Sequence, residues 1–124
     1  MLNISHYKII AIGKIKKKWI QEGIEMYLKR LPGLEVKEIK DSTQLKEEYS
    51  IKEIIGKNEL LVTLNENGQS FTSKQLATKL LNSHNQNISF VIGGASGLPP
   101  SLINSASWQL SLSPLTFPHE IARL

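Results

Sequence analysis

The chain has 124 residues, a formal net charge of +4 and no cysteine. This length allows a hydrophobic core but not two domains, so we expect a single domain over residues 1–124. The absence of cysteine excludes a disulfide framework and a thiolate zinc site, and with only three histidines we expect no metal site. Because no apolar run approaches bilayer length and no secretory signal pattern opens the chain, we expect a cytoplasmic protein with no membrane partner.

Charge is distributed unevenly along the chain. Twelve of the fifteen Lys and Arg residues and nine of the eleven acidic residues precede Leu61. The first half therefore offers a basic surface, which permits a polyanionic partner. The nearly uncharged second half suits a pocket for a small, partly apolar ligand.

The first half predicts strand, helix, strand and helix in that order. The apolar run at 7–12 ends at Gly13 and predicts a buried strand, and residues 34–39 predict a second one. A helix is predicted over 19–31, and another follows a cap at Asp41 or Ser42. We expect their apolar faces to comprise Trp19, Ile20, Gly23, Ile24, Tyr27, Leu28 and Leu31 in the first helix, and Leu45, Tyr49, Ile51, Ile54 and Ile55 in the second.

The second half continues the alternation. Residues 60–64 predict a third strand, and Asn65-Glu66-Asn67-Gly68 predicts a turn after it. Thr72 as N-cap with Gln75 in a capping box predicts a helix that runs to about Asn82. Residues 88–92 predict the fourth strand, Pro99-Pro100-Ser101 opens a short helix, and the alternating Trp108, Leu110 and Leu112 predict the fifth strand.

This order of elements predicts an α/β fold. Strands that alternate with helices imply a mainly parallel sheet of about five strands, with helices on both faces. Ligands of such sheets bind beyond the carboxyl ends of the strands. Gly13, Asn65, Gly93 and Ser113 follow strands in this way.

The glycine-rich bend at 93–97 is the most informative local feature. Three glycines in five residues indicate either a tight turn or a close approach of a ligand to the backbone, and residue types alone leave the two equal. A dinucleotide fingerprint would need glycine in place of Ala95 and Leu98, and Leu98 also breaks a hydrolase elbow around Ser96. No phosphate-cradling Gly-Lys-Ser or Gly-Lys-Thr occurs, so a plain nucleotide-binding module is disfavoured.

Two motifs together carry a resemblance to a known family. The runs 91–98 and 108–119, with Thr63-Leu64 before them, resemble the bacterial ribosomal RNA large subunit methyltransferase H family in residues and spacing. Residues 11–14, Trp19 and 25–31 resemble that family's first strand and helix, so the similarity spans nearly the whole chain. A Gly-Gly-x-x-Gly is weak alone, but it is specific when Leu-Ser-x-x-Thr-Phe-Pro-His follows at this distance.

The resemblance implies a fold, an activity and a cofactor. The fold is the α/β knot of SPOUT methyltransferases, and the activity is methylation of a pseudouridine ring nitrogen in 23S ribosomal RNA, with S-adenosylmethionine as methyl donor. The family also implies a homodimer, and we assign no catalytic residue. The cofactor contacts implied by the resemblance fall on Leu64, Gly93, Leu112, Ser113, Pro114, Leu115, Thr116 and Phe117. Without it, the leucines and Phe117 would pass as core, and Ser113 and Thr116 as turn or cap residues.

A run of lysines precedes the first predicted helix. Cations at a helix N-terminus oppose the helix dipole, so a cluster there favours phosphate contacts, whereas a solvated lysine face is an equal alternative. The candidates for binding RNA are Lys14, Lys16, Lys17, Lys18, His119 and Arg123.

The chain ends at Leu124, whereas the family continues with a full helix and a polar tail. We therefore expect the fold to lack its last knot helix. Either the sequence is a truncated copy of an active enzyme, or it is a non-catalytic RNA-binding or ribosome-associated fragment.

Overall fold

A computed structural model describes residues 4–40, 44–55, 59–82, 86–93 and 98–111. It contains one five-stranded sheet, all of whose strand pairs are parallel, in the order β2-β1-β4-β3-β5. The strands are β1 (Tyr7–Ile12), β2 (Glu35–Ile39), β3 (Leu60–Ser70), β4 (Ile88–Ile92) and β5 (Trp108–Ser111). The helices are a 3-10 turn at Ile4–His6, α1 (Lys18–Arg30), α2 (Gln44–Ile54), α3 (Ser73–Asn82) and α4 (Pro100–Asn104). The predicted α/β class is confirmed.

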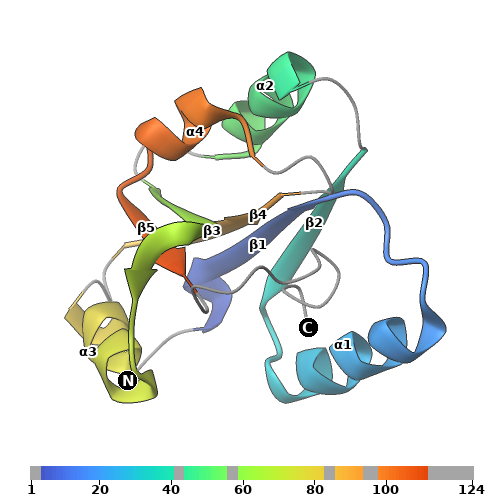
Figure 1. The fold of residues 1–124 in the computed structure, drawn as a ribbon. Coiled ribbons are helices and arrows are strands. Elements are labelled where there is room, and N and C mark those ends of the chain that lie inside the picture. The colour runs from blue at the N-terminus through green and yellow to red at the C-terminus, as the bar shows by residue number, and fades with distance from the viewer. Residues whose placement is uncertain (1–3, 41–43, 56–58, 83–85, 94–97, 112–124) are drawn as a thin grey trace.

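The strand order explains why helices cover both faces of the sheet. The connections through α1 and α3 step one way across the sheet, while those through α2 and α4 step the other way. When crossovers share one hand, opposite steps place the helices on opposite faces. Figure 1 shows this arrangement, with α2 and α4 above the sheet and α1 and α3 below it.

Each face has its own apolar cluster. Under α2 and α4, the fully buried Ile51 and Leu102 pack with Ile10, Ile12 and Val91 of the central strands. On the α3 side the buried residues are Tyr7, Val62, Ile88 and Leu110, with Phe71, Phe90, Trp108 and Leu80 packed against them. The central position of β1 and β4 explains their nearly continuous apolar sequence, because both of their faces are covered.

A capping box marks the start of α3. The Gln75 backbone N–H donates to Thr72 Oγ1 at 3.1 Å, and the Thr72 N–H donates to Gln75 Oε1 at 2.9 Å. This is the capping box predicted from the sequence.

The predicted strand at 88–92 and the short helix after Pro99 are also confirmed. The predicted caps Asp41 and Ser42 lie outside the described residues.

The expected turn at 65–68 is wrong. Residues 65–68 continue strand β3, and the pairing with β5 changes register between Leu64 and Gln69, so that Leu110 lies opposite both. A Cβ at Gly68 would lie 2.8 Å from the carbonyl carbon and oxygen of Gln109. Gly68 is therefore a close-approach glycine against β5, where Asn-Gly suggested a turn.

The predicted apolar faces of the first two helices are wrong in part. In α1, Ile20 is buried, but Trp19, Tyr27 and Leu31 are exposed, as is Met26. In α2, Tyr49 is exposed, and its hydrogen bond to the Glu53 carboxylate raises the pKa of Tyr49. Helical spacing identifies which residues share a face but does not say whether that face is covered.

Candidate functional site

The carboxyl ends of β1 and β4 meet at one edge of the sheet, beside the middle of β3. Ile92, the last residue of β4, lies opposite Ala11 of β1 on one side and Leu64 of β3 on the other. Leu64 in turn lies opposite Leu110 of β5. Gly93 therefore leaves the sheet between the end of β1 and Leu64 of β3, at the carboxyl end of β4, and ligands of parallel sheets bind beyond such strand ends.

The structure brings together two of the eight predicted cofactor residues. Leu64 and Gly93 are both half-buried, and Leu64 packs on the α3 side of the sheet. The other six occupy positions 112–117, outside the described residues. Leu112 follows Ser111 directly in the sequence, and Ser111 ends β5 beside β3.

A polar cluster beside Leu64 was not among the predicted site residues. The Asn65 Nδ2 donates to Gln109 Oε1 at 3.2 Å, and the Gln109 Nε2 donates to the Ile103 carbonyl at 3.3 Å. Within the described part of the chain, Asn65 Oδ1 and the hydroxyl of the fully buried Thr63 have no hydrogen-bond partner. The sequence contains one signal for this polar cluster, because Gln109 is a polar residue between the apolar Trp108 and Leu110 of a strand.

The predicted lysine run lies at the same edge of the sheet. It follows Gly13, whose backbone N–H donates to the Ile39 carbonyl at 2.8 Å beyond the ends of β1 and β2. The predicted RNA-binding residues Lys14, Lys16, Lys17 and Lys18 are all exposed.

The start of α1 is electrostatically unfavourable. Its N-cap is Lys17, which makes no side-chain capping bond, and its first turn has no acidic residue. Lys18 Nζ lies 4.0 Å from Glu22 Oε1, and both side chains are largely exposed, so this ion pair is weak. His119 and Arg123, the other RNA candidates, lie outside the described residues.

A cavity of about 330 Å³ adjoins the lysine run between α1 and β2. Its lining residues are Lys14, Ile15, Gln21, Ile24, Glu25, Val36 and Glu38. Gln21 Nε2 donates to the Ile15 carbonyl at 2.6 Å and so ties α1 to the lysine run. The two carboxylates in the lining disfavour a phosphate inside this cavity.

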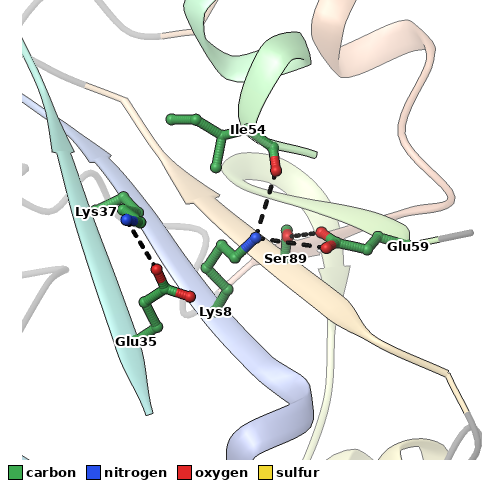
Figure 2. Close-up of polar contacts among 6 residues, drawn as sticks. All are labelled: Lys8, Glu35, Lys37, Ile54, Glu59 and Ser89. Atoms are coloured by element: carbon green, nitrogen blue, oxygen red, sulfur yellow. Dashed lines mark hydrogen bonds and ion pairs between the residues drawn. The ribbon is translucent and has the colours of Figure 1, made fainter. Parts of the chain in front are cut away.

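A second polar cluster lies at the opposite edge of the sheet (Figure 2). Lys8 Nζ lies 3.4 Å from both Glu59 Oε1 and the Ile54 carbonyl, and the Ser89 hydroxyl donates to Glu59 Oε2 at 2.6 Å. A serine, a carboxylate and an amine suggest nucleophilic chemistry, but Ser89 is fully buried. The cluster therefore joins β1, β4 and the start of β3, and it offers no substrate access.

Among the described residues, no three His, Asp or Glu side chains lie together in a way that could hold a metal ion. Within the same part of the chain, none of the helices is both long and apolar enough to cross a bilayer.

Comparisons with known proteins agree on one family. The model of the family described as "Predicted SPOUT methyltransferase" matches residues 5–124. The chain is 93% identical to ribosomal RNA large subunit methyltransferase H of Prochlorococcus marinus strain NATL2A, over all of this chain and 86% of that relative's length. It is 52% identical to the protein of the same name from Parasynechococcus marenigrum strain WH8102, over 99% of this chain and 85% of that relative.

The chain also has a more distant likeness to a solved structure. The SpoU methyltransferase AviRb from Streptomyces viridochromogenes, solved in complex with AdoMet, aligns with 94% of this chain and 53% of its own. The TM-score is 0.43 and the sequence identity is 10%.

Proposed function

Because this chain belongs to the SPOUT methyltransferase family, we propose that it transfers a methyl group from S-adenosylmethionine to large-subunit ribosomal RNA. The finer proposal is that the acceptor is a ring nitrogen of a pseudouridine in 23S ribosomal RNA. The observation that carries the proposal is the match of the family model to residues 5–124. It is supported by the 93% identity to a ribosomal RNA large subunit methyltransferase H. A protein that acts on ribosomal RNA in bacteria works in the cytoplasm.

The residues at the sheet edge suit the proposed cofactor. S-adenosylmethionine combines an apolar adenine face with amine and hydroxyl donors, so it needs an apolar wall and buried acceptors. Leu64 supplies apolar surface on the α3 side of β3. Asn65 Oδ1, on the opposite face of the strand, is a buried acceptor for which the described residues provide no hydrogen bond. We propose that Gly93 lets the backbone approach the cofactor, and that positions 112–117 complete the pocket.

The proposed mechanism relies on positioning. When bound, the cofactor would supply a methyl group on a sulfonium. The acceptor nitrogen would form a bond to the methyl carbon as the carbon–sulfur bond breaks, with S-adenosylhomocysteine as the leaving group and the ring N–H proton released to solvent. Such a transfer needs no metal and no covalent enzyme intermediate, so the protein has to hold the two reactants in line. Leu64 and Gly93 fix one side of the cofactor, and the edge beside the lysine run presents the RNA.

A transfer assay tests the activity and its target together. The chain is incubated with S-adenosylmethionine labelled in the methyl group and with large-subunit RNA that carries its pseudouridines. We expect label in RNA, and in a pseudouridine after digestion to nucleosides. The matched control is a transcript of the same sequence with only uridine, which should take up no label. Label in neither RNA, with the cofactor bound normally, would favour the non-catalytic RNA-binding alternative.

We propose that Lys14, Lys16, Lys17 and Lys18 contact RNA phosphates. Their support is the exposed cluster at an uncapped helix start, next to the strand ends. Replacing Lys16, Lys17 and Lys18 by glutamine should lower RNA affinity and reduce the slope of log affinity against log salt by about 2 to 3. The matched control replaces Lys29, Lys52 and Lys74 by glutamine, which removes the same charge away from the start of α1. Equal losses in both triple variants would mean that net charge alone is responsible.

We also propose that the protein forms a homodimer through α1. The support is an exposed apolar stripe of Trp19, Met26 and Tyr27, of which Trp19 is 58% exposed. Sedimentation of a variant with Trp19→Ser and Tyr27→Ser should give a smaller species than the unchanged protein. Tyr49→Ser on α2 is the control, because Tyr49 is exposed away from this stripe.

A further inference from the structure

We propose that Asn65 binds the cofactor through its side-chain oxygen and that Gln109 is the positioning residue that orients it. The inference rests on the proposed function, since it assigns a residue of the same site. Asn65 Oδ1 accepts a hydrogen bond from an N–H or O–H group of S-adenosylmethionine.

The orientation of the Asn65 amide follows from a chain of hydrogen bonds. The Ile103 carbonyl can only accept, so the end of the Gln109 side chain that faces it must be Nε2, which donates at 3.3 Å. Gln109 Oε1 then faces Asn65 and accepts from Asn65 Nδ2 at 3.2 Å. Asn65 Nδ2 is therefore held at Gln109, and Asn65 Oδ1, an acceptor, is the buried amide atom for which the described residues provide no hydrogen bond.

That oxygen is buried and has no hydrogen-bond partner among the residues that the structure describes. Asn65 Oδ1 has essentially no exposed surface, and the neighbouring Thr63 hydroxyl, on the same face of β3, is buried and unpartnered as well. A buried acceptor without a hydrogen bond costs free energy, so native proteins seldom keep one that no ligand or water uses. Two such atoms two residues apart indicate a binding site for a polar ligand.

The position of Asn65 connects it to the cofactor. Asn65 follows Leu64 directly and faces the other side of β3, and Leu64 lies opposite Ile92, the residue before Gly93. Asn65 thus stands at the carboxyl end of the β3–β4 pairing, where a ligand of a parallel sheet binds. Because the available atom of Asn65 is an acceptor, the cofactor group that meets it must be a donor. S-adenosylmethionine has three kinds of donor: the α-ammonium, the ribose hydroxyls and the adenine amino group.

Calorimetry with three probes tests the assignment. The probes are S-adenosylmethionine, S-adenosylhomocysteine and methylthioadenosine, which lacks the amino-acid part. We expect Asn65→Ala to weaken binding of S-adenosylmethionine about tenfold, the effect of losing one well-placed hydrogen bond. Asn67→Ala is the matched control, because Asn67 is an exposed asparagine of the same strand. This variant should bind S-adenosylmethionine with the affinity of the unchanged protein.

The three probes identify the donor. A loss confined to the two ligands that carry the amino acid assigns the α-ammonium, while an equal loss for all three assigns a ribose or adenine donor. Unchanged affinity for all three in Asn65→Ala would overturn the proposal, even if the melting temperature fell. If the unchanged protein binds none of the probes, the proposed function itself fails, which is a different result.

The role of Gln109 has its own readout. Gln109→Leu should weaken cofactor binding by less than Asn65→Ala does, because the asparagine remains but is no longer oriented. In the double variant the losses should not add, since Gln109 acts only through Asn65. Additive losses would mean that Gln109 does not act through Asn65 and would overturn its positioning role.

Discussion

Lys8, Glu59 and Ser89 bring a charged pair and a hydroxyl together at the N-terminal ends of β1, β4 and β3. Side-chain exposure is 17% for Lys8 and 15% for Glu59, so the pair is largely shielded from water. Removal of one partner from such a pair leaves the other charge poorly solvated. In this cluster, unlike at Asn65, each shielded polar group has a hydrogen-bond or ion-pair partner within the protein.

Glu59→Leu should lower the free energy of unfolding by about 1 to 3 kcal/mol, since the Lys8 ammonium and the Ser89 hydroxyl both lose their acceptor. Urea unfolding measures the change. The double variant with Lys8→Met should be more stable than Glu59→Leu alone, because no unpaired charge remains. Equal stability of Glu59→Leu and the unchanged protein would show that the ion pair contributes nothing.

Gly68→Ala should lower the free energy of unfolding by about 1 to 3 kcal/mol, because the added Cβ meets the Gln109 backbone at 2.8 Å and forces β3 and β5 apart. Chemical denaturation measures this change too. Asn67→Ala, at an exposed neighbouring position, should leave stability nearly unchanged. Because Gln109 also orients Asn65, Gly68→Ala should weaken cofactor binding as well.

Among the elements, α2 and α4 are joined by a carboxylate. The Ser101 hydroxyl donates to Glu48 Oε2 at 2.7 Å, and Lys52 Nζ lies 2.9 Å from Glu48 Oε1. The hydrogen bond from Ser101, followed by that from Lys52, lowers the pKa of Glu48 from its usual value. A lowered pKa in the folded state means that Glu48 stabilises the fold above its ordinary pKa, and that this contribution is lost as the pH falls.

Ser101→Ala should therefore make stability less dependent on pH in the acid range. Relative to the unchanged protein, the loss of stability should be visible at neutral pH and should shrink as the pH falls below the ordinary pKa of a glutamate, where Glu48 becomes protonated. Urea midpoints at several pH values measure it. Ser105→Ala is the control, since the Ser105 hydroxyl donates to the Leu102 carbonyl and its effect should not vary with pH.

The elements also show what sequence reasoning can reach. The capping box at Thr72 and the apolar run at 88–92 are local signals, and both predicted their elements correctly. The continuation of β3 through Asn65 to Gly68 depends on β5, far along the chain, so a local Asn-Gly signal pointed to a turn instead. The exposure of Trp19 and Tyr27 likewise depends on what packs against α1, which helical spacing does not contain.

For the site, Leu64 and Gly93 were predicted from a motif, and the register places them together. The Asn65–Gln109 contact was not predicted, because it needs the pairing of β3 with β5 and the position of the Ile103 carbonyl. Motifs identify residues that a family shares, whereas hydrogen-bond geometry identifies those that this particular fold brings together.

At the scale of the whole molecule, we expect protection from hydrogen exchange to be greatest in the centre of the sheet. β4 pairs on both sides and is buried along most of its length, whereas β2 is an edge strand with mostly exposed side chains. Hydrogen exchange should therefore be slowest in β4 and β1 and markedly faster in β2, because central strands open only with the whole fold. Exchange in β2 as slow as in β4 would mean that another chain covers that edge.

The strand order has a consequence for synthesis of the chain. β1 is made first, but one of its two neighbours, β4, is made only when residue 92 has been added. While the nascent polypeptide grows, β1 can pair with β2 but keeps an apolar edge open to other chains. A ribosome that pauses between β2 and β4 would hold this edge exposed, so the codons for residues 40–87 are where slow translation carries the greatest risk of aggregation.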